Sequence, residues 1–382
     1  MAEKKALILA SVASMIDQFN MQNIELLQSL GFKVDVIADF TNPGNLSATR
    51  CEKLCSNLND VSVRFFDIPI PRSLNPRTVI HAYKEVKGII KREKYELVHC
   101  HSPIGGVIAR LAAKNSRKSG TIVIYTAHGF HFYKGAPLKN WLLYYPVEWL
   151  CAHWTDVLIT INKEDYDRAK KHMHAKRVEY VPGVGIDSKR FMNATVDRAA
   201  KRREIDVPED AILLVSVGEL NENKNHSVVI KALAKNGNRN IHYAIAGKGD
   251  IADDLKKLAS SEGMQDQVHL LGFRDDVNEI YAAADICVFP SIREGLGLAA
   301  VEGMACGLPL IVSDNRGTRG FLGAENAITC RYDDVDAFAE AIQILSNDKE
   351  LCMKMGALNQ EKSRAFDYAI VNKQMKQIYG LE

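Results

Sequence analysis

Short apolar runs alternate with amphipathic helical patterns along the whole chain. In the first half, apolar runs occupy residues 5–11, 33–40, 95–102, 120–129, 156–163 and 177–185, and residues 19–31 have a helical spacing. In the second half, they occupy residues 211–218, 241–250, 267–273, 284–291, 308–315 and 327–331. Strands that alternate with helices predict a parallel sheet covered by helices on both faces. Because the polar segment 196–210 separates the two series, the pattern predicts two such sheets.

The chain of 382 residues is long enough for two domains. We predict an α/β protein of two doubly wound domains, an N-terminal domain over 1–190 and a C-terminal domain over 191–365. Segment 366–382 is predicted to be a helix that crosses back to the N-terminal domain. Because ligands bind beyond the carboxyl ends of parallel strands, we expect the two sheets to face each other across a cleft.

The charge is divided unevenly between the two halves. Residues 1–195 contain 27 Lys and Arg against 18 Asp and Glu, a net charge of +9, and the remaining 22 against 29 give −7. This excess favours an anionic partner for the first half, such as membrane headgroups, a phosphorylated lipid or nucleic acid. The alternative is an ordinary solvated surface without a partner.

The cysteines and the apolar runs bear on the cellular location. The eight cysteines form no CxxC framework, so we expect neither zinc nor disulfides, and a reducing cytosol. The N-terminus "MAEKKALILASVAS" is better interpreted as a first strand than as a signal peptide. The sequence contains no run of 18 apolar residues that would indicate a membrane span. We expect a cytoplasmic protein, with a peripheral location on the inner face of the cell membrane as the alternative.

The stretch "PSIREGLGLAAVEGMACGLP" at 290–309 contains Glu294 and Glu302, eight positions apart. A helix that starts near Leu296 would direct its free amides at the preceding glycine loop and form an anion site. Eight positions span about 12 Å on an ideal helix, more than the roughly 5 to 9.5 Å between the carboxylates of glycoside hydrolases. The spacing instead fits carboxylates that hold hydroxyls at the two ends of a nucleotide sugar.

Four segments resemble one enzyme family. "REGLGLAAVEGMACGLP" looks like the E-x7-E signature of the retaining glycosyltransferases of family 4, and "LGFRDDVNEIYAAADICVFPS" is similar to the segment that precedes it. "SVGELNENKNHSVVIKAL" resembles the family's Val-Gly-Arg-Leu segment, with Lys224 in register, and "VPGVGIDSKRF" resembles its interdomain linker. The resemblance, to the exopolysaccharide and capsule type, covers most of the chain and is strongest over 212–330.

The resemblance implies the GT-B architecture of two Rossmann-like domains, with the donor bound mainly by the second. It implies that Glu294 holds donor-sugar hydroxyls, Glu302 the ribose hydroxyls and Lys224 the diphosphate. The histidine near the transferred sugar is assigned to His128, with His131 as the alternative. No metal ion or other cofactor is expected for this chemistry, because fixed cations and amides can stabilise the leaving diphosphate.

Further residues are assigned by the same resemblance. The implied donor-binding residues are Gly218, Gly247, Gly249, Phe273, Arg274, Arg293, Gly295, Leu296, Gly297, Leu298 and Ala299. The implied acceptor-side residues are Ser11, Ser14, His101 and Gly105.

Two features depart from the family pattern. Glu219 stands where the family usually has an arginine that shares the diphosphate with the lysine. The alternatives are that Lys224 acts alone, that Arg293, Arg274 or Arg316 contributes, or that activity is partly lost. The N-terminal loop "ASVASMIDQFN" lacks the family's double glycine.

Three other motifs allow competing interpretations. Gly247, Gly249 and Ala252 satisfy G-x-G-x-x-A, but the acidic residue that a NAD site needs about 20 positions later is absent. His99 and His101 flank Cys100, but in a strand Cys100 points to the face opposite the two histidines and no carboxylate lies alongside, so we expect no metal. We expect His99 in the core and His101 at the cleft. The aromatic segment 141–154 fits either a buried helix or a surface for lipid or acceptor sugar.

We therefore expect a retaining glycosyltransferase that uses a nucleotide sugar, UDP-linked rather than GDP-linked. The expected acceptor is a polyprenyl-diphosphate saccharide in bacterial surface polysaccharide synthesis, with peripheral contact to an anionic membrane and no nucleic acid partner. The alternatives are a GT-B-like sugar-nucleotide 2-epimerase and a nucleotide-sugar-binding protein without turnover.

Overall fold

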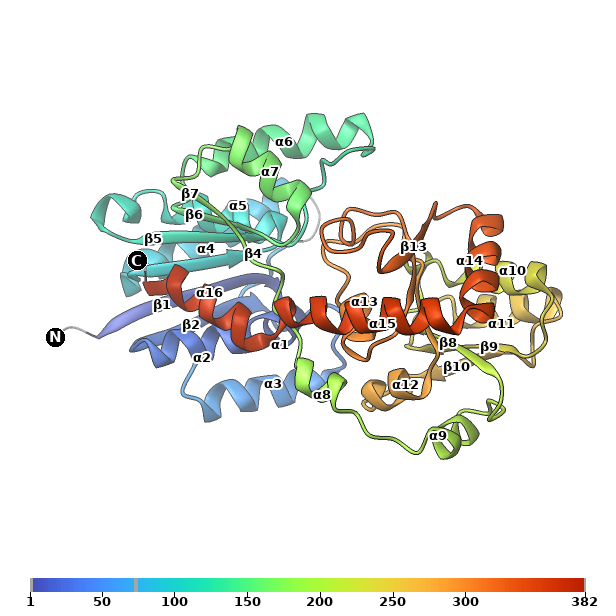
Figure 1. The fold of residues 1–382 in the computed structure, drawn as a ribbon. Coiled ribbons are helices and arrows are strands. Elements are labelled where there is room, and N and C mark those ends of the chain that lie inside the picture. The colour runs from blue at the N-terminus through green and yellow to red at the C-terminus, as the bar shows by residue number, and fades with distance from the viewer. Residues whose placement is uncertain (1–2, 72–74, 381–382) are drawn as a thin grey trace. The chain divides into compact units, whose positions relative to one another are not determined.

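The computed structural model describes residues 3–71 and 75–380 and contains two compact units (Figure 1). The first unit comprises Met1–Val184 with Ala369–Glu382, and the second comprises Gly185–Tyr368. The chain thus passes between units at 184/185 and 368/369, where the sequence suggested 190/191 and 365/366. Residues 1–2 and 381–382, which belong to the outer predicted segments, lie outside the described residues.

The first unit contains a parallel sheet with the strand order β3-β2-β1-β4-β5-β6-β7. Its strands are β1 (Lys4–Val12), β2 (Phe32–Asp39), β3 (Arg64–Asp67), β4 (Leu97–His101), β5 (Ile122–Ala127), β6 (Val157–Thr160) and β7 (Arg177–Tyr180). The apolar runs predicted all of these except β3. That strand has only four residues and begins and ends with a charged residue, so it leaves no apolar run in the sequence.

Helices lie on both faces of this sheet (Figure 1). They are α1 (Ala13–Phe19), α2 (Met21–Ser29), α3 (Ala48–Asp60), α4 (Pro76–Glu93), α5 (Pro103–Ala113), the 3-10 helix η1 (Ser116–Ser119), α6 (Leu138–Ala152), α7 (Lys163–His172) and α16 (Tyr368–Gly380). The N-terminal segment interpreted above as a loop contains a helix. This helix, α1, occupies residues 13–19 and starts directly after β1.

The second unit repeats the arrangement, with the parallel strand order β10-β9-β8-β11-β12-β13. Its strands are β8 (Ile212–Val217), β9 (Ile241–Ala246), β10 (Val268–Gly272), β11 (Ile286–Phe289), β12 (Leu310–Ser313) and β13 (Ala327–Cys330). Its helices are α8 (Ser188–Met192), α9 (Arg198–Glu204), the 3-10 helix η2 (Glu222–Lys224), α10 (His226–Asn236), α11 (Ala252–Ser261), α12 (Val277–Ala283), α13 (Leu298–Ala305), α14 (Val335–Asn347), α15 (Lys349–Ser363) and the 3-10 helix η3 (Arg364–Phe366). The predicted fold class, two doubly wound parallel sheets, is confirmed.

Each sheet is buried on both faces. In β1, Leu7 and Leu9 belong to one apolar cluster, whereas Ile8 belongs to the cluster on the opposite face. In β8, Val215 and Leu214 divide in the same way. Successive strand residues point to opposite faces, so two-sided burial requires continuous apolar runs rather than alternation. This requirement explains why the sequence pattern identified the central strands.

The C-terminal helical segment is interrupted. After α15 and η3, Asp367 forms a bridge with Ile186, and α16 begins at Tyr368. The α16 side chains Val371, Met375 and Tyr379 pack within an apolar cluster of the first unit.

Candidate functional site

The second unit has a topological switch point between β8 and β11. From these adjacent strands the strand order runs in opposite directions, to β9 and β10 on one side and to β12 and β13 on the other. Open α/β sheets bind ligands in the crevice beyond the carboxyl ends of such strands. The loop after β8 contains Glu219, and the loop after β11 contains Glu294.

Lys224 and Glu294 form an ion pair at this switch point. The Lys224 Nζ lies 2.7 Å from the Glu294 Oε1, and the two side chains are 22% and 15% exposed. Asn221 positions the lysine, because its Oδ1 accepts from the Lys224 N–H at 3.0 Å. The Nζ also lies 5.6 Å from the centre of the Phe289 ring, at the end of β11. A fixed cation and a carboxylate thus meet where a ligand is expected.

Hydrogen bonds hold the two loops together. The Ile292 N–H donates to the Asn223 carbonyl at 2.8 Å, and the Asn223 Nδ2 donates to the Arg293 carbonyl at 2.9 Å. Asn225 adds a bond from its Nδ2 to the Pro290 carbonyl at 3.2 Å. The ion pair is therefore set by the backbone of both loops. Asn223 and Asn225 were not singled out from the sequence, because their partners are distant in the chain.

Glycines permit close backbone approach around the pair. A Cβ on Gly247 would lie 1.8 Å from the Gly218 carbonyl oxygen, and one on Gly249 would lie 2.1 Å from the Leu220 oxygen. The G-x-G-x-x-A motif is thus explained by contact with the β8 loop. A Cβ on Gly317, which the sequence did not single out, would lie 2.7 Å from the Glu294 Cβ. These glycines position the loops that carry Lys224 and Glu294.

The helix in the E-x7-E stretch is α13, which begins at Leu298 rather than near Leu296. Because residues 294–297 are not helical, the helical rise used above does not give the separation of Glu294 and Glu302. Gly297 precedes the helix without a side-chain cap. The Leu298 N–H donates to the Leu296 carbonyl at 3.0 Å, so this amide already has a local partner.

Glu302 lies on α13 and is partly buried. Burial raises the pKa of its carboxyl to about 7, and the nearby Arg190 guanidinium opposes this rise. A carboxyl with this pKa is partly protonated at neutral pH. The two glutamates of the motif therefore differ, since Glu294 is compensated by a lysine and Glu302 lies in an apolar environment.

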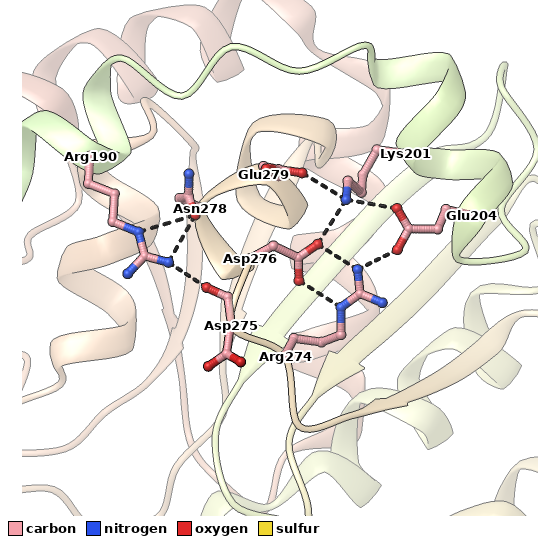
Figure 2. Close-up of polar contacts among 8 residues, drawn as sticks. All are labelled: Arg190, Lys201, Glu204, Arg274, Asp275, Asp276, Asn278 and Glu279. Carbon is pink, nitrogen blue, oxygen red and sulfur yellow. Dashed lines mark hydrogen bonds and ion pairs between the residues drawn. The ribbon is translucent and has the colours of Figure 1, made fainter.

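Arg274 is committed to a separate ion-pair cluster, shown in Figure 2. Its guanidinium donates to both carboxylate oxygens of Asp276, at 2.7 and 2.5 Å, and to Glu204. Lys201 binds Glu204 and Asp276, each at 2.8 Å. The guanidinium of Arg274 holds the pKa of Asp276 well below its usual range. Arg274 thus joins α9 to the loop after β10, and donor binding through it would require these contacts to break.

Some of the other predicted donor residues near Arg274 and Glu294 are more exposed to solvent. Phe273 and Arg293 are exposed, and Gly295 and Leu296 are partly buried. Glu219, which replaces the family's usual arginine, is exposed, and its Oε2 accepts from the Asn221 Nδ2 at 3.0 Å. The same asparagine therefore orients Glu219 and Lys224.

The first unit has its own switch point, between β1 and β4. Three of the predicted acceptor-side residues lie there: Ser11, His101 and Gly105. Ser11 lies in the buried part of β1, and its Oγ lies 2.6 Å from the Ser102 Oγ. A Cβ on Gly105 would lie 2.7 Å from the Ser102 Oγ, so Gly105 is needed where α5 approaches β1. Ser102 has φ +64°, a left-handed conformation that is strained for serine and is found at functional sites. Ser14 lies apart, on α1, and its N–H donates to the Pro43 carbonyl at 2.9 Å.

Three histidines lie close together in the first unit: His99 and His101 belong to β4, and His128 directly follows β5. The His101 Nδ1 lies 3.1 Å from the His128 Nε2, and His99 binds the Tyr379 hydroxyl of α16 at 2.8 Å. Burial lowers the pKa of His128 to about 4 and that of His99 to about 3, and it lowers the pKa of His101 as well. All three imidazoles are therefore neutral at pH 7, able to donate or accept a hydrogen bond but not to supply charge.

His101 and His128 line a cavity of about 30 Å³ in the first unit, together with Phe19, Thr126 and Asn372. The His101 Nε2 is buried and has no hydrogen-bond partner. A cavity needs roughly 10–15 Å³ of such space to hold a water, so there is room here for one that pairs with this nitrogen. His99 is in the core, as predicted, but His101 is also buried.

The comparisons with known proteins agree with this geometry. Family models described as Glycosyltransferase Family 4 and Glycosyl transferases group 1 match residues 21–190 and 197–362. The glycosyltransferase EpsD of Bacillus subtilis (strain 168) is 38% identical over 99% of this chain and 96% of its own length. The chain belongs to the family 4 glycosyltransferases. The family resemblance read from the motifs is thereby confirmed.

Two further relatives extend the comparison. A UDP-Gal:alpha-D-GlcNAc-diphosphoundecaprenol alpha-1,3-galactosyltransferase of Escherichia coli is 28% identical over 90% of this chain and 87% of its own. The crystal structure of Anabaena Alr3699/HepE in complex with UDP matches with a TM-score of 0.78 at 17% identity, covering 99% of this chain and all of that one. This match shows that the glycosyltransferase has the GT-B fold, as predicted.

The described side chains offer no grouped metal ligands. Within residues 3–71 and 75–380, no three His, Cys, Asp or Glu side chains of the glycosyltransferase cluster as a metal site requires. His99 and His101 instead bind Tyr379 and His128, respectively.

Proposed function

We propose that this glycosyltransferase transfers a sugar from a UDP-sugar, with retention of configuration, to a lipid-diphosphate-linked saccharide. The observation that carries the proposal is the Lys224–Glu294 pair, fixed by both loops at the switch point of the second unit. The names of the relatives support it, since the E. coli enzyme uses UDP-Gal and a diphosphoundecaprenol acceptor and the Anabaena protein binds UDP.

In the proposed mechanism, Lys224 stabilises the charge that develops on the departing diphosphate. Breaking the glycosidic bond places negative charge on the leaving UDP, and a preorganised cation there lowers the barrier. Glu294 accepts hydrogen bonds from donor-sugar hydroxyls while it keeps Lys224 in place. Amides at Gly297 and Ala299 and the loops of Gly218, Gly247 and Gly249 complete the diphosphate site. The Leu298 amide would join them only by releasing its hydrogen bond to the Leu296 carbonyl. We expect no metal ion or other cofactor for this step.

The acceptor hydroxyl is proposed to attack from the face that the diphosphate leaves. Glu294 is paired with Lys224, which suits a role in orientation rather than as a covalent nucleophile. On the first unit, the neutral His128 offers a hydrogen bond near the transferred sugar, and Ser11 and Gly105 adjoin the acceptor. A lipid-borne acceptor would also bring the enzyme to the inner face of the cell membrane as a peripheral protein.

The test is a donor screen that measures UDP or GDP release from a panel of nucleotide sugars. We expect UDP release that depends on a lipid-diphosphate saccharide and persists after chelation with EDTA. A protein that only binds the donor would gain thermal stability with UDP yet release none, an outcome that the carboxylate at Glu219 makes worth testing. Glycosidic product of inverted configuration would contradict retention.

A further inference from the structure

The exposed face of α6 is almost entirely apolar. Of its eight exposed residues, seven are apolar and one is a lysine: Leu138, Lys139, Leu142, Leu143, Pro146, Val147, Trp149 and Leu150. Among the described residues, fifteen large hydrophobic side chains are exposed, and α6 contributes six of them. A contiguous apolar surface on this scale marks a site of interaction with a membrane or another molecule.

The opposite face of α6 is also apolar and is firmly packed. Trp141, Tyr144 and Tyr145 pack against an apolar cluster of the first unit. A soluble helix usually has a polar outer face, and a helix that is apolar all round is normally buried or in contact with lipid. The outer face of α6 therefore needs a partner that the rest of this unit does not supply.

A buried polar network anchors the helix. The Arg110 Nη2 donates to the Glu148 Oε2 at 2.8 Å, and the Tyr125 hydroxyl donates to the Glu148 Oε1 at 3.1 Å. Arg110 and Glu148 are both buried. This network fixes the rotation of α6 about its axis, so the apolar face is presented rigidly.

The charges around α6 favour an anionic surface. Glu148 is the one acidic residue between 130 and 153, and Arg110 compensates it in the interior. Glu164 of α7 accepts from the Lys134 N–H at 2.7 Å and is compensated by Arg168 at 3.3 Å. The exposed charges at the start of the helix are Lys134 and Lys139. Lysines beside an apolar face with an aromatic residue such as Trp149 are typical of helices that lie in the headgroup region of a bilayer.

The length of the helix excludes a membrane span. α6 has 15 residues, and at 1.5 Å per residue it is about 22 Å long, shorter than the roughly 30 Å hydrocarbon core. No helix in the described part of the chain is long and apolar enough to cross a membrane. If α6 contacts lipid, it lies along the surface.

We propose that the outer face of α6 docks the enzyme on an anionic lipid bilayer, with Leu142 and Leu150 in the apolar layer and Lys134 and Lys139 at the headgroups. The proposal deepens the proposed function, in which the acceptor is carried by a lipid. It places the membrane contact on a specific surface of the first unit.

The test is flotation of the full-length protein with vesicles of phosphatidylglycerol and phosphatidylethanolamine, and with vesicles of phosphatidylcholine alone. We expect binding to the anionic vesicles that weakens with salt, and a blue shift of tryptophan emission from Trp149. Leu142→Glu should weaken binding at least about tenfold, because a buried leucine contributes roughly 1.5–3 kcal/mol. Lys139→Gln should weaken it about fivefold, since one surface lysine is worth about 1 kcal/mol.

Met353→Glu is the matched control, since Met353 on α15 is 70% exposed and Leu142 is 71% exposed. Equal weakening by both variants, or no vesicle binding by the wild type, would overturn the proposal. A dimer that forms without lipid and that Leu142→Glu dissociates would assign the surface to a second copy instead. Donor turnover is measured separately without vesicles. Vesicle binding without UDP release would contradict the proposed function but not the docking surface. UDP release without vesicle binding would contradict the docking surface but not the proposed function.

Discussion

The two units have the same doubly wound topology but opposite chemistry at their switch points. In the second unit, the partly exposed Lys224 and Glu294 bring formal charges together beyond β8 and β11. In the first unit, the corresponding position between β1 and β4 holds Ser11, Ser102 and Gly105, and the adjacent histidines are buried and neutral. Both sheets have a switch point, and the side chains placed there differ in charge.

Under the proposed function, this difference matches the two substrates: the second unit binds a charged donor, and the first unit binds an uncharged acceptor hydroxyl. A diphosphate needs a cation and amides, whereas a sugar hydroxyl needs neutral donors and acceptors. Variants at the switch point of the second unit should therefore affect stabilisation of the leaving diphosphate. Variants at that of the first unit should affect the orientation of the acceptor hydroxyl.

The largest expected effect comes from removing the charged pair. Lys224→Ala should lower kcat by about 10²–10³-fold, the usual cost of losing one preorganised charge-stabilising group, and Glu294→Ala should reduce transfer to background. Both are measured by UDP release, with circular dichroism to confirm folding. Lys257→Ala, an exposed lysine on α11, is the control. Unchanged activity in Glu294→Ala would refute the assignment of the donor site.

The second-largest expected effect comes from adding a side chain where the glycine loops approach each other closely. Gly247→Ala should lower the free energy of unfolding by about 3 kcal/mol, because its Cβ would lie 1.8 Å from the Gly218 oxygen. Gly88→Ala, in the middle of α4 with no atom within 4 Å of the added Cβ, should instead raise it by about 0.5–1 kcal/mol. Urea denaturation compares the two, and an equal response would contradict the packing argument.

UDP binding should depend on pH through Glu302. The carboxyl must ionise to hold ribose hydroxyls, and its pKa of about 7 means that affinity should fall about tenfold per unit below pH 7. Calorimetric titration from pH 5 to 8 measures this slope. Glu302→Gln in the same buffers removes the contribution of the carboxyl but keeps the titration of the nucleotide. If both proteins give the same slope, Glu302 does not contact the ribose.

The neutral histidines of the first unit should make it sensitive to acid. Because the pKa of folded His128 is about 4, its contribution is fully present above pH 6.5 and is lost as the pH falls from about 6.5 towards 4. The unfolding temperature of His128→Asn should therefore decline less between pH 7 and 5 than that of the wild type. His172→Asn, at the exposed end of α7, controls for the loss of one imidazole.

The smallest expected effect is restoration of the missing cation. Glu219→Arg should tighten UDP binding only severalfold, because exposed charge interactions are worth about 0.2–1 kcal/mol. Glu222→Arg changes the net charge equally from a neighbouring exposed position. Equal gains in both variants would indicate a general charge effect rather than a specific contact with the diphosphate.

The sequence was most informative where structure depends on consecutive residues. The apolar runs located the central strands, and "REGLGLAAVEGMACGLP" identified the donor motif and its helix to within two residues. It was least informative at β3, whose four residues begin and end with a charged residue. The strained Ser102 and the loop glycine Gly317 also left no local signal.

The sequence by itself determined two βα series, the E-x7-E motif and the uneven charge. Only the tertiary structure decided that Lys224 meets Glu294 across 70 positions, that Arg274 is held by Glu204 and Asp276, and that Glu302 lies where its pKa rises. The physical reason is that periodicity follows from the geometry of neighbouring residues, whereas these contacts depend on the order in which parallel strands assemble. That order places the ends of β8 and β11 side by side, although 68 residues separate Val217 from Ile286 in the chain.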